Sequence, residues 1–237
     1  MLKIDNLSIL YKSTGQLAVK DVSFSVKKGE VLALLGPSGC GKTTILNTIS
    51  GLLTTKEAQI EGVIALGNGE KDLTMTTVFQ EPRLLPWRRV LRNISYGLEA
   101  SGLNKKEALV KASKIIKTVN LDNYENYLPA QLSIGMQQRV NFARALVCNP
   151  NIMLLDEPFS ALDVDTKETI IKEFKNVIIK NSITGIFVTH NVEEAFSLAN
   201  RIITLSGRPS SVKNTIERKN FNKIPEGVID YLDPFRD

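Results

Sequence analysis

The segment from residue 30 to residue 53 constrains the fold more than any other part of this sequence. The run Glu30–Leu35 is short and continuously apolar after its glutamate, which is typical of a strand buried on both faces of a sheet. A glycine-rich stretch follows at once, and Thr43–Leu53 has the spacing of a helix. Strand, glycine-rich loop and helix in this order begin a parallel α/β unit. We therefore expect an α/β fold on a mainly parallel core sheet.

The remainder of the chain alternates between strand-like and helix-like patterns, as expected for a parallel sheet covered by helices. Segments 90–101, 104–119 and 135–147 are helix-like, so we predict a helical insertion over about 88–147. A weak pattern after Ser206 predicts a strand and then a short helix. The other predicted strands are 2–10, 18–27, 60–67, 151–155, 184–188 and 202–205, and the other predicted helices are 163–181 and 191–199.

The glycine-rich stretch matches the P-loop pattern, which binds phosphate. Glycines let backbone N–H groups curl around a phosphate, and the helix that follows presents unpaired N–H groups and a positive dipole end. In this pattern Lys42 reaches the β- and γ-phosphates, and the Thr43 hydroxyl binds Mg²⁺. The pattern alone does not specify the task, because a small-molecule kinase has the same loop. The predicted phosphate-binding residues are Gly36, Pro37, Ser38, Gly39, Cys40, Gly41, Lys42, Thr43 and Thr44.

Two acids, Asp156 and Glu157, end the apolar run that starts at Ile152. Ligands of α/β sheets bind at the carboxyl ends of parallel strands, so Asp156 is placed to hold Mg²⁺ beside the P-loop. Glu157 is then placed to accept a proton from the water that attacks the γ-phosphate. An acidic turn after a buried strand is the alternative.

A third motif precedes a predicted helix at 135–147. Ser133 is a natural N-cap, and a helix N-terminus can face an anion. A simple capped helix fits these residues equally well. The motif consists of Leu132, Ser133, Ile134, Gly135 and Met136.

Together with the P-loop, these segments resemble the ATP-binding subunits of ABC transporters. LSIGMQQRV looks like the family's signature segment, and Asp156-Glu157 follows it as in the family. The resemblance extends over residues 2–207. It implies a P-loop NTPase with an N-terminal antiparallel β subdomain and an inserted helical subdomain. We expect one ATPase domain over 1–207, with 208–237 as its C-terminal tail.

The resemblance implies roles for four further residues. Gln80 matches the Q-loop glutamine, which contacts Mg²⁺ and water and relays motion. Asp163 matches the D-loop, and His190 matches the switch histidine that senses the γ-phosphate. Tyr11 stands where an aromatic ring stacks on adenine. By their residue types alone, Tyr11 could be a packing residue and His190, the only histidine, an ordinary surface or core residue.

The signature segment departs from the family at two positions. Ile134 replaces a frequent glycine, and a β-branched residue does not comfortably adopt a positive φ. We therefore predict a negative φ at Ile134, with Gly135 as the point of close approach. Met136 replaces a glutamine, and its effect on turnover stays open.

The resemblance also implies partners. Two copies face each other head to tail with ATP between one P-loop and the other copy's Ser133–Gly135, so we expect a homodimer that binds ATP and Mg²⁺. We also expect transmembrane permease subunits and a solute-binding protein, and no nucleic acid. Trp87, with Arg83, Arg88, Arg89 and Arg92 around it, is a candidate docking edge for the permease. The alternative is a core tryptophan among solvated arginines.

Composition agrees with this interpretation without selecting it. The net charge of +5 suits nucleotide, nucleic acid or an anionic membrane face, and also a mildly basic protein without such a partner. No uncharged stretch approaches the ~18 residues of a membrane span, and the first ten residues do not resemble a signal peptide. The two cysteines suit a reducing compartment. We expect a cytoplasmic protein that is peripheral on the inner face of the cell membrane.

The stretch QEPRLLPW, the methionine in LSIGM and the Ser206–Pro209 run look like the importer branch for nitrate, sulfonates, taurine and related solutes. The motor does not touch its cargo, so this assignment rests on association. The rival hypotheses are a nucleotide or sugar kinase, a DNA-repair or chromosome-clamp ATPase, a translation-associated ATPase, an exporter motor and a nucleotide switch without turnover. No sustained heptad run supports the coiled coils of the clamp class.

Overall fold

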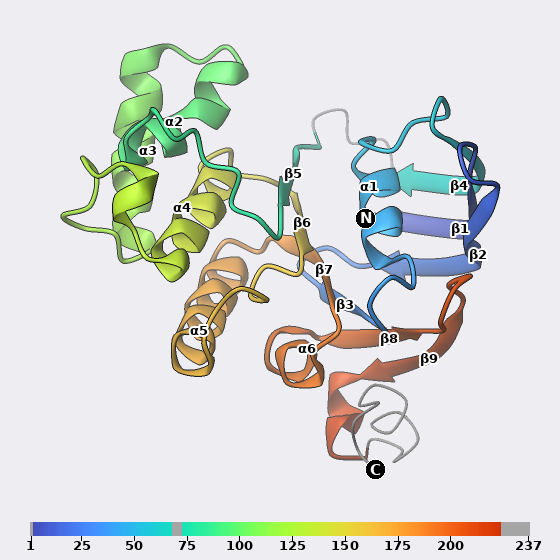
Figure 1. Cartoon of the computed structure of the whole chain (residues 1–237). Coiled ribbons are helices and arrows are strands. Elements are labelled where there is room, and N and C mark those ends of the chain that lie inside the picture. Colours follow the sequence, from blue (N-terminus) through green and yellow to red (C-terminus); the bar gives the residue numbers. More distant parts are fainter. Residues whose placement is uncertain (1, 68–72, 224–237) are drawn as a thin grey trace. The chain divides into compact units, whose positions relative to one another are not determined.

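The computed structural model describes residues 2–67 and 73–223, which form two compact units (Figure 1). Unit 1 comprises Met1–Leu73 and Thr184–Asp237, and unit 2 comprises Thr74–Ile183. Within the described ranges, no helix is long and apolar enough to cross a membrane.

Unit 1 contains a three-stranded antiparallel sheet in the order β2-β1-β4. Along β1, the apolar residues Leu2, Ile4, Leu7 and Ile9 are fully buried, and most of the residues between them are exposed or half-buried. This near-alternation is what a sheet with one covered face requires. The strands are β1 (Leu2–Tyr11), β2 (Gln16–Val26) and β4 (Ala58–Leu66).

The second sheet of unit 1 carries the glycine-rich loop. Its central strand, β3 (Val31–Leu35), is buried at every residue and pairs in parallel with both β7 and β8. The antiparallel strand β9 lies at the edge beside β8. Helix α6 packs on β3 and β7, and α1 contacts β7. The remaining elements are α1 (Lys42–Ile49), β7 (Thr184–Thr189), α6 (Val192–Leu198), β8 (Arg201–Leu205), β9 (Val212–Glu217) and the 3₁₀ helix η2 (Arg218–Lys223).

Unit 2 joins two parallel strands to a cluster of helices (Figure 1). Helix α4 packs against α2, α3, α5 and β5, so it is the centre of this unit. The rings of Phe142 on α4 and Phe174 on α5 stack with centroids 3.7 Å apart. The elements are β5 (Met75–Val78), α2 (Val90–Ala100), α3 (Lys105–Thr118), the 3₁₀ helix η1 (Pro129–Gln131), α4 (Ile134–Leu146), β6 (Ile152–Asp156) and α5 (Val164–Lys180).

The structure confirms the predicted fold class, with parallel and antiparallel sheets and inserted helices, and each predicted strand and helix is present with small shifts at its ends. Strand β5 was not predicted. Helix α1 ends at Ile49 rather than Leu53, because Gly51 adopts a φ of +74°, which ends a helix. The predicted strand and short helix of the tail correspond to β9 and η2, whereas residues 224–237 lie outside the described residues. The domain boundaries at 88–147 and 207 stay predictions.

Candidate functional site

The predicted site residues divide between the two units. Unit 1 holds Tyr11, residues 36–44 and His190, and unit 2 holds Gln80, the signature segment 132–136, Asp156, Glu157 and Asp163. In unit 1 the strand order brings the P-loop and His190 together, and in unit 2 it brings Gln80 close to the two acids. The predicted position of Asp156 beside the P-loop relates the two units and stays a prediction.

In unit 1, the P-loop and His190 leave two neighbouring parallel strands at the same edge. Leu35 at the end of β3 is the register partner of Thr189 at the end of β7. The P-loop (residues 36–44) follows the first strand, and His190, which is exposed, follows the second. The Gly36 N–H also donates to the Thr189 carbonyl at 3.4 Å. The carboxyl edge of this sheet therefore presents a phosphate-type loop and a histidine side by side, as ligand sites of α/β sheets require.

The P-loop has the local geometry of an anion site. Gly41 at the N-cap of α1 has a φ of +124°, which glycine adopts readily, and no side chain caps the helix. The N-terminal N–H groups of α1 are therefore not covered by a side-chain cap, and the helix dipole favours an anion there. The buried Lys42 ammonium donates to the carbonyls of Gly36 and Pro37 at 2.9 and 3.0 Å, which keeps its charge at the loop.

Tyr11 lies at the same loop. Its hydroxyl and that of Thr44 are 3.0 Å apart, and the ring is half-buried at the end of β1. The structure thus places an aromatic side chain next to the start of α1, where the resemblance implies adenine stacking. Thr43, the predicted Mg²⁺ ligand of this loop, is exposed.

In unit 2, Gln80 and the two acids also leave neighbouring parallel strands. Val78 at the end of β5 pairs with Leu155, which precedes Asp156 at the end of β6. Gln80 follows β5 by two residues and is exposed, whereas Asp156 is buried. Gln80 and Asp156, whose side-chain oxygens can bind a metal ion, therefore occur at one edge of the strand pair. Glu157 follows Asp156 directly. Glu157 adopts a φ of +40°, which is uncommon outside glycine and is found at functional sites.

The signature segment forms the start of α4 as predicted. The Ser133 hydroxyl accepts from the Met136 N–H at 3.3 Å, which is an N-cap bond. Ile134 is the first helical residue and is absent from the non-glycine residues with positive φ, so the predicted negative φ is confirmed. Gly135 has a role that the sequence did not reveal: a Cβ there would lie 2.9 Å from Thr166 Cγ2 on α5. Gly135 therefore allows α4 to pack closely on α5 of the same chain.

Asp163 also caps a helix. Its carboxylate accepts from the Thr166 N–H at 3.0 Å and so defines the start of α5. The neighbouring Ser160 hydroxyl donates to the Glu157 carbonyl at 3.0 Å. The D-loop and the end of β6 are thus joined by local hydrogen bonds.

Three residues of α4 that sequence reasoning missed hold the Q-loop segment, which we define as residues 79–83. Gln138 donates to the Gln80 carbonyl at 2.6 Å, and Asn141 donates to the Phe79 carbonyl at 3.1 Å. Arg144 donates to the carbonyls of Pro82 and Arg83, both at 2.8 Å.

Gln138 and Asn141 are almost completely buried, and the bonds to these carbonyls help to satisfy the N–H groups of their side-chain amides. Burial lowers the pKa of Arg144, but a guanidinium stays charged at any physiological pH. The polar positions 138, 141 and 144 recur every third residue along α4, which was the one available signal in the sequence. The helix that begins at the signature segment is thus bonded to the backbone of the Q-loop segment.

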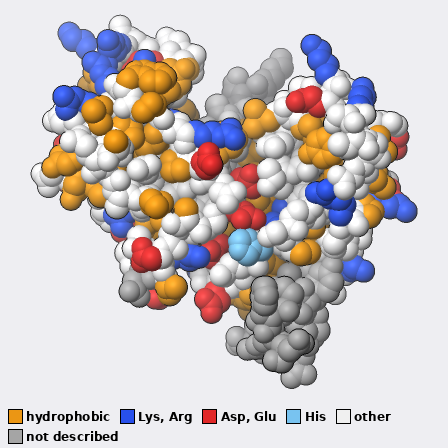
Figure 2. Space-filling model, viewed as in Figure 1, with side chains coloured by type: hydrophobic (Ala, Val, Ile, Leu, Met, Phe, Trp, Pro, Cys, Tyr) orange, Lys and Arg blue, Asp and Glu red, His pale blue; other side chains and the backbone are white. Residues whose placement is uncertain are grey.

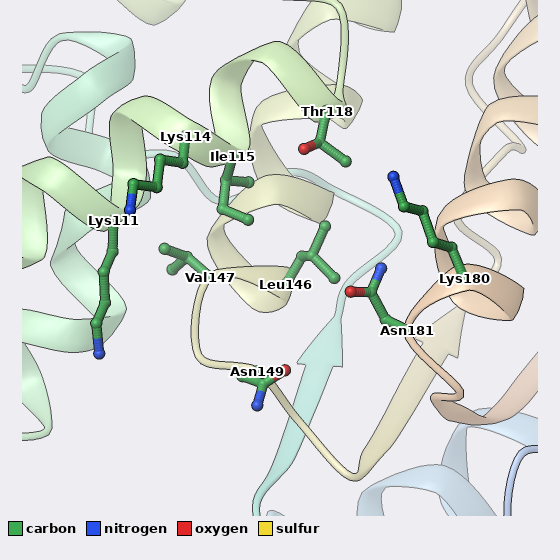
Figure 3. A pocket seen from close by; sticks show the side chains of 9 residues that line it. All are labelled: Lys111, Lys114, Ile115, Thr118, Leu146, Val147, Asn149, Lys180 and Asn181. Carbon is green, nitrogen blue, oxygen red and sulfur yellow. The ribbon is translucent and has the colours of Figure 1, made fainter.

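A separate pocket of unit 2 holds none of the predicted site residues. Its volume is about 260 Å³, and Lys111, Lys114 and Lys180 contribute to its lining. Figure 3 shows these three side chains pointing in different directions rather than at a common point. The pocket therefore lacks the converging cations that an anion site needs.

Comparisons with known proteins show the family of this chain. The sequence model of the ABC transporter family matches residues 19–160. An uncharacterized ABC transporter ATP-binding protein of Methanocaldococcus jannaschii is 40% identical over 91% of this chain and 81% of its own length. A taurine import ATP-binding protein, TauB of Yersinia pestis, is 39% identical over 94% of this chain and 85% of its own.

An aliphatic sulfonates import ATP-binding protein, SsuB of Bacillus cereus, is 39% identical over 90% of this chain and 82% of its own. Among solved structures, a dimeric ATP-binding cassette in a post-hydrolysis state with ADP and phosphate matches with a TM-score of 0.79 and 31% identity. That match covers 93% of this chain and 100% of the cassette.

The bonds from α4 to the Q-loop segment yield a test. Gln138→Ala removes the donor to the Gln80 carbonyl and loosens the backbone at that residue, so we expect hydrolysis to fall about tenfold, as for the loss of one buried hydrogen bond. ATP binding to the P-loop should change little, because Gln138 belongs to unit 2. Steady-state phosphate release and nucleotide titration measure the two effects. Gln131→Ala is the control, since among the described residues the oxygen of that amide accepts from the Leu128 N–H and from no donor of the Q-loop segment. Wild-type turnover in Gln138→Ala would contradict a positioning role for these bonds.

Proposed function

Since the chain belongs to the ABC transporter family, we propose that it powers an importer for a small anion or metabolite, such as nitrate, a sulfonate or taurine. It is an ATP-binding ATPase of that family. The observation that carries the importer assignment is the 39% identity with taurine and sulfonate import ATP-binding proteins over at least 90% of this chain. We infer that the protein is cytoplasmic and peripheral on the inner membrane face.

The roles we propose follow from the chemistry of each group. The backbone of residues 36–44 and the Lys42 ammonium bind the polyphosphate, and the Tyr11 ring stacks on adenine. Glu157 accepts the proton of the attacking water, and His190 contacts the γ-phosphate. Gln80 orients that water, a task that a glutamine side chain performs in other P-loop enzymes.

Mg²⁺ fits the donors that this chain offers. The Thr43 hydroxyl, the Gln80 amide oxygen and the Asp156 carboxylate are oxygen ligands, which Mg²⁺ prefers. The described residues contain no group of three or more His, Cys, Asp or Glu residues placed to hold a metal, so a cage made only of such side chains is not available there. This suits an ion that shares its coordination among phosphates, water and a few side chains. When bound, Mg²⁺ neutralises charge on the β- and γ-oxygens.

We propose that two copies close over ATP, with Ser133–Gly135 of one copy facing the P-loop of the other. The similar cassette of known structure is dimeric. In this chain, two apolar side chains of the signature and D-loop regions are exposed, Ile134 by 54% and Val164 by 81%. Such side chains gain free energy when a second surface covers them. ATP strengthens this contact through its γ-phosphate, and hydrolysis removes that attraction.

Lys42→Ala tests the phosphate site. Loss of the ammonium removes charge-assisted hydrogen bonds, so we expect ATP affinity to fall on the order of 100-fold. Titration with a fluorescent ATP analogue gives the dissociation constant. Lys12→Ala is the matched control, because Lys12 is exposed and, in the part of the chain that the structure describes, its ammonium donates to the Thr55 carbonyl alone. Equal affinity in Lys42→Ala and wild type would argue against the assignment of residues 36–44.

Glu157→Gln tests the general base and the dimer together. The amide cannot accept the water proton, so we expect ATP binding without appreciable hydrolysis and accumulation of an ATP-bound dimer. Light scattering with ATP and Mg²⁺ gives the mass, and phosphate release gives the turnover. Glu107→Gln, at an exposed position of α3, is the control. Normal turnover in Glu157→Gln would remove Glu157 from this role, and a strictly monomeric ATP-bound form would exclude the dimer.

The proposed permease edge lies at the start of α2. Trp87 is 74% exposed, so the alternative of a core tryptophan is wrong. It lines a hollow of about 400 Å³ together with Arg88, Arg89, Arg92 and residues of α2 and α3. Arg88 is held there by Glu99 at 3.1 Å and lies over the Tyr96 ring. A large exposed aromatic side chain among partly fixed arginines is typical of a protein interface.

Basic side chains also gather over α2 and α3, as Figure 2 shows. On α3, Lys105, Lys106, Lys111, Lys114 and Lys117 are exposed. Positive charge of this kind is attracted to the anionic inner face of a membrane. It supports the membrane-associated location that we propose.

Trp87→Ala tests the docking edge. We expect it to reduce co-purification with the permease that wild-type protein retains from solubilised membranes, since interface tryptophans often contribute 2 kcal/mol or more, roughly a 30-fold loss of affinity. The melting temperature should stay near that of wild type, because the side chain is exposed. Val110→Ala removes another exposed apolar side chain, on α3, and serves as control. Undiminished co-purification of Trp87→Ala would show that the permease docks elsewhere.

A further inference from the structure

The loop that joins β8 and β9, residues 206–211, lies against the P-loop. A Cβ on Gly41 would lie 3.1 Å from Ser210 Oγ, and one on Gly36 would lie 3.3 Å from Leu205 Cβ, just before this loop. The sequence motifs gave no role to residues 206–211 in the nucleotide site. The two loops are nevertheless in direct contact within unit 1.

Two side chains of the 206–211 loop donate hydrogen bonds to consecutive carbonyls of the P-loop. Ser210 Oγ donates to the Cys40 carbonyl at 2.6 Å, and Ser210 is completely buried. Arg208 Nη2 donates to the Gly39 carbonyl, also at 2.6 Å, from an exposed position. Both bonds therefore act on the turn that leads into α1.

These carbonyls determine where the following N–H groups point. In a planar trans peptide, C=O and N–H point in opposite directions. A donor that holds the Cys40 carbonyl toward Ser210 therefore turns the Gly41 N–H the other way, away from Ser210. Gly41 is the N-cap of α1, and N–H groups of this stretch are those that bind phosphate in a P-loop. The Arg208 bond likewise fixes the peptide between Gly39 and Cys40, whose N–H donates to the Pro37 carbonyl at 3.3 Å.

The sequence of the P-loop makes such external fixation necessary. Gly39 and Gly41 both have positive φ, at +73° and +124°. Glycine reaches many other backbone conformations at little cost, so the peptide groups on either side of Cys40 rotate easily unless something holds them. Fixing them before the nucleotide arrives reduces the entropy that binding must overcome.

The 206–211 loop is itself well anchored. The Ser210 N–H donates to the Ala18 carbonyl at 2.9 Å, and the Ser210 carbonyl accepts from the Lys20 N–H at 2.8 Å. Within the loop, the Ser206 hydroxyl donates to the Pro209 carbonyl at 3.0 Å and accepts from the Ser211 N–H at 2.8 Å. The donors of Ser210 and Arg208 therefore come from a fixed base.

We propose that Ser210 and Arg208 are positioning residues that hold the P-loop peptides in the orientation that binds the polyphosphate of ATP. Neither side chain needs to touch the nucleotide. The inference rests on the assignment of residues 36–44 as the phosphate site. The segment between β8 and β9 would then influence the affinity for nucleotide through the backbone of the P-loop.

Ser210→Ala tests the buried bond. We expect the dissociation constants of both ATP and ADP, and the KM for ATP, to rise about tenfold, whereas kcat changes less than threefold, because the bond acts on binding rather than on the proton transfer. Ser210→Cys, with a weaker donor of similar size, should give an intermediate affinity.

Arg208→Ala should weaken ATP binding about threefold, since its bond is exposed to water. Titration with a fluorescent ATP analogue, well below the melting temperature, measures each value.

Matched controls separate positioning from general stability. Ser211→Ala removes a hydroxyl whose one hydrogen-bond partner within residues 2–67 and 73–223 is Ser206 Oγ of the same loop. Lys213→Ala removes one exposed positive charge, as Arg208→Ala does. Both controls should bind ATP as wild type does.

The outcomes of the two proposals differ. If Ser210→Ala and Arg208→Ala bind ATP with wild-type affinity while Lys42→Ala does not, the positioning role is wrong and the phosphate site stands. If Lys42→Ala also binds normally, the phosphate site itself is wrong. Should Ser210→Ala fail to fold, the exposed Arg208→Ala and its Lys213→Ala control decide the question.

Discussion

A polyphosphate carries several negative charges, and a protein can surround it with N–H donors only where the backbone curls without side chains in the way. In this chain the proposed place is the turn between β3 and α1. Because β3 is buried at every residue and paired on both sides, the turn always starts from the same point. The burial of this apolar strand therefore fixes the position at which the glycine-rich loop begins.

The same rule organises the rest of the site. His190 follows β7, Gln80 follows β5 and Asp156 ends β6, so every catalytic or metal-binding group of the proposal that lies outside the P-loop leaves a parallel strand at its carboxyl end. Backbone carbonyls that these turns expose are then bonded by side chains from elsewhere in the same unit. Gln138 does this for the Q-loop segment, and Ser210 does it for the P-loop. The strand ends thus determine where each loop begins, and hydrogen bonds from side chains distant in the sequence hold the loop backbone in place.

Much of this was predictable from the sequence because it depends on short segments. The apolar run before the glycines, the serine that caps α4 and the steric limit on Ile134 are local signals, and the structure confirms each. Strand β5 was missed because its sequence, MTTV, is short and half polar. The donors to the loops were missed for another reason: Ser210 lies 170 residues from Cys40, and Arg144 lies 62 residues from Pro82. The spacing of polar residues along α4 shows that this helix carries donors, but no pattern in the sequence identifies their distant partners.

The unusual isoleucine of the signature segment shows how a departure from a family pattern can be accommodated. At the first position of α4, residue 134 has a helical backbone, so a glycine is not needed for its conformation. The need for a small residue falls on Gly135, where α5 leaves no room for a Cβ. Since the Ile134 side chain is more than half exposed, it neither blocks the capping serine nor displaces the helix N-terminus. In the proposed dimer it adds apolar area at the junction, and each 40 Å² that the partner covers contributes about 1 kcal/mol. In the proposed dimer, isoleucine at position 134 is therefore expected to strengthen the contact between the two copies while leaving the N-terminus of α4 intact.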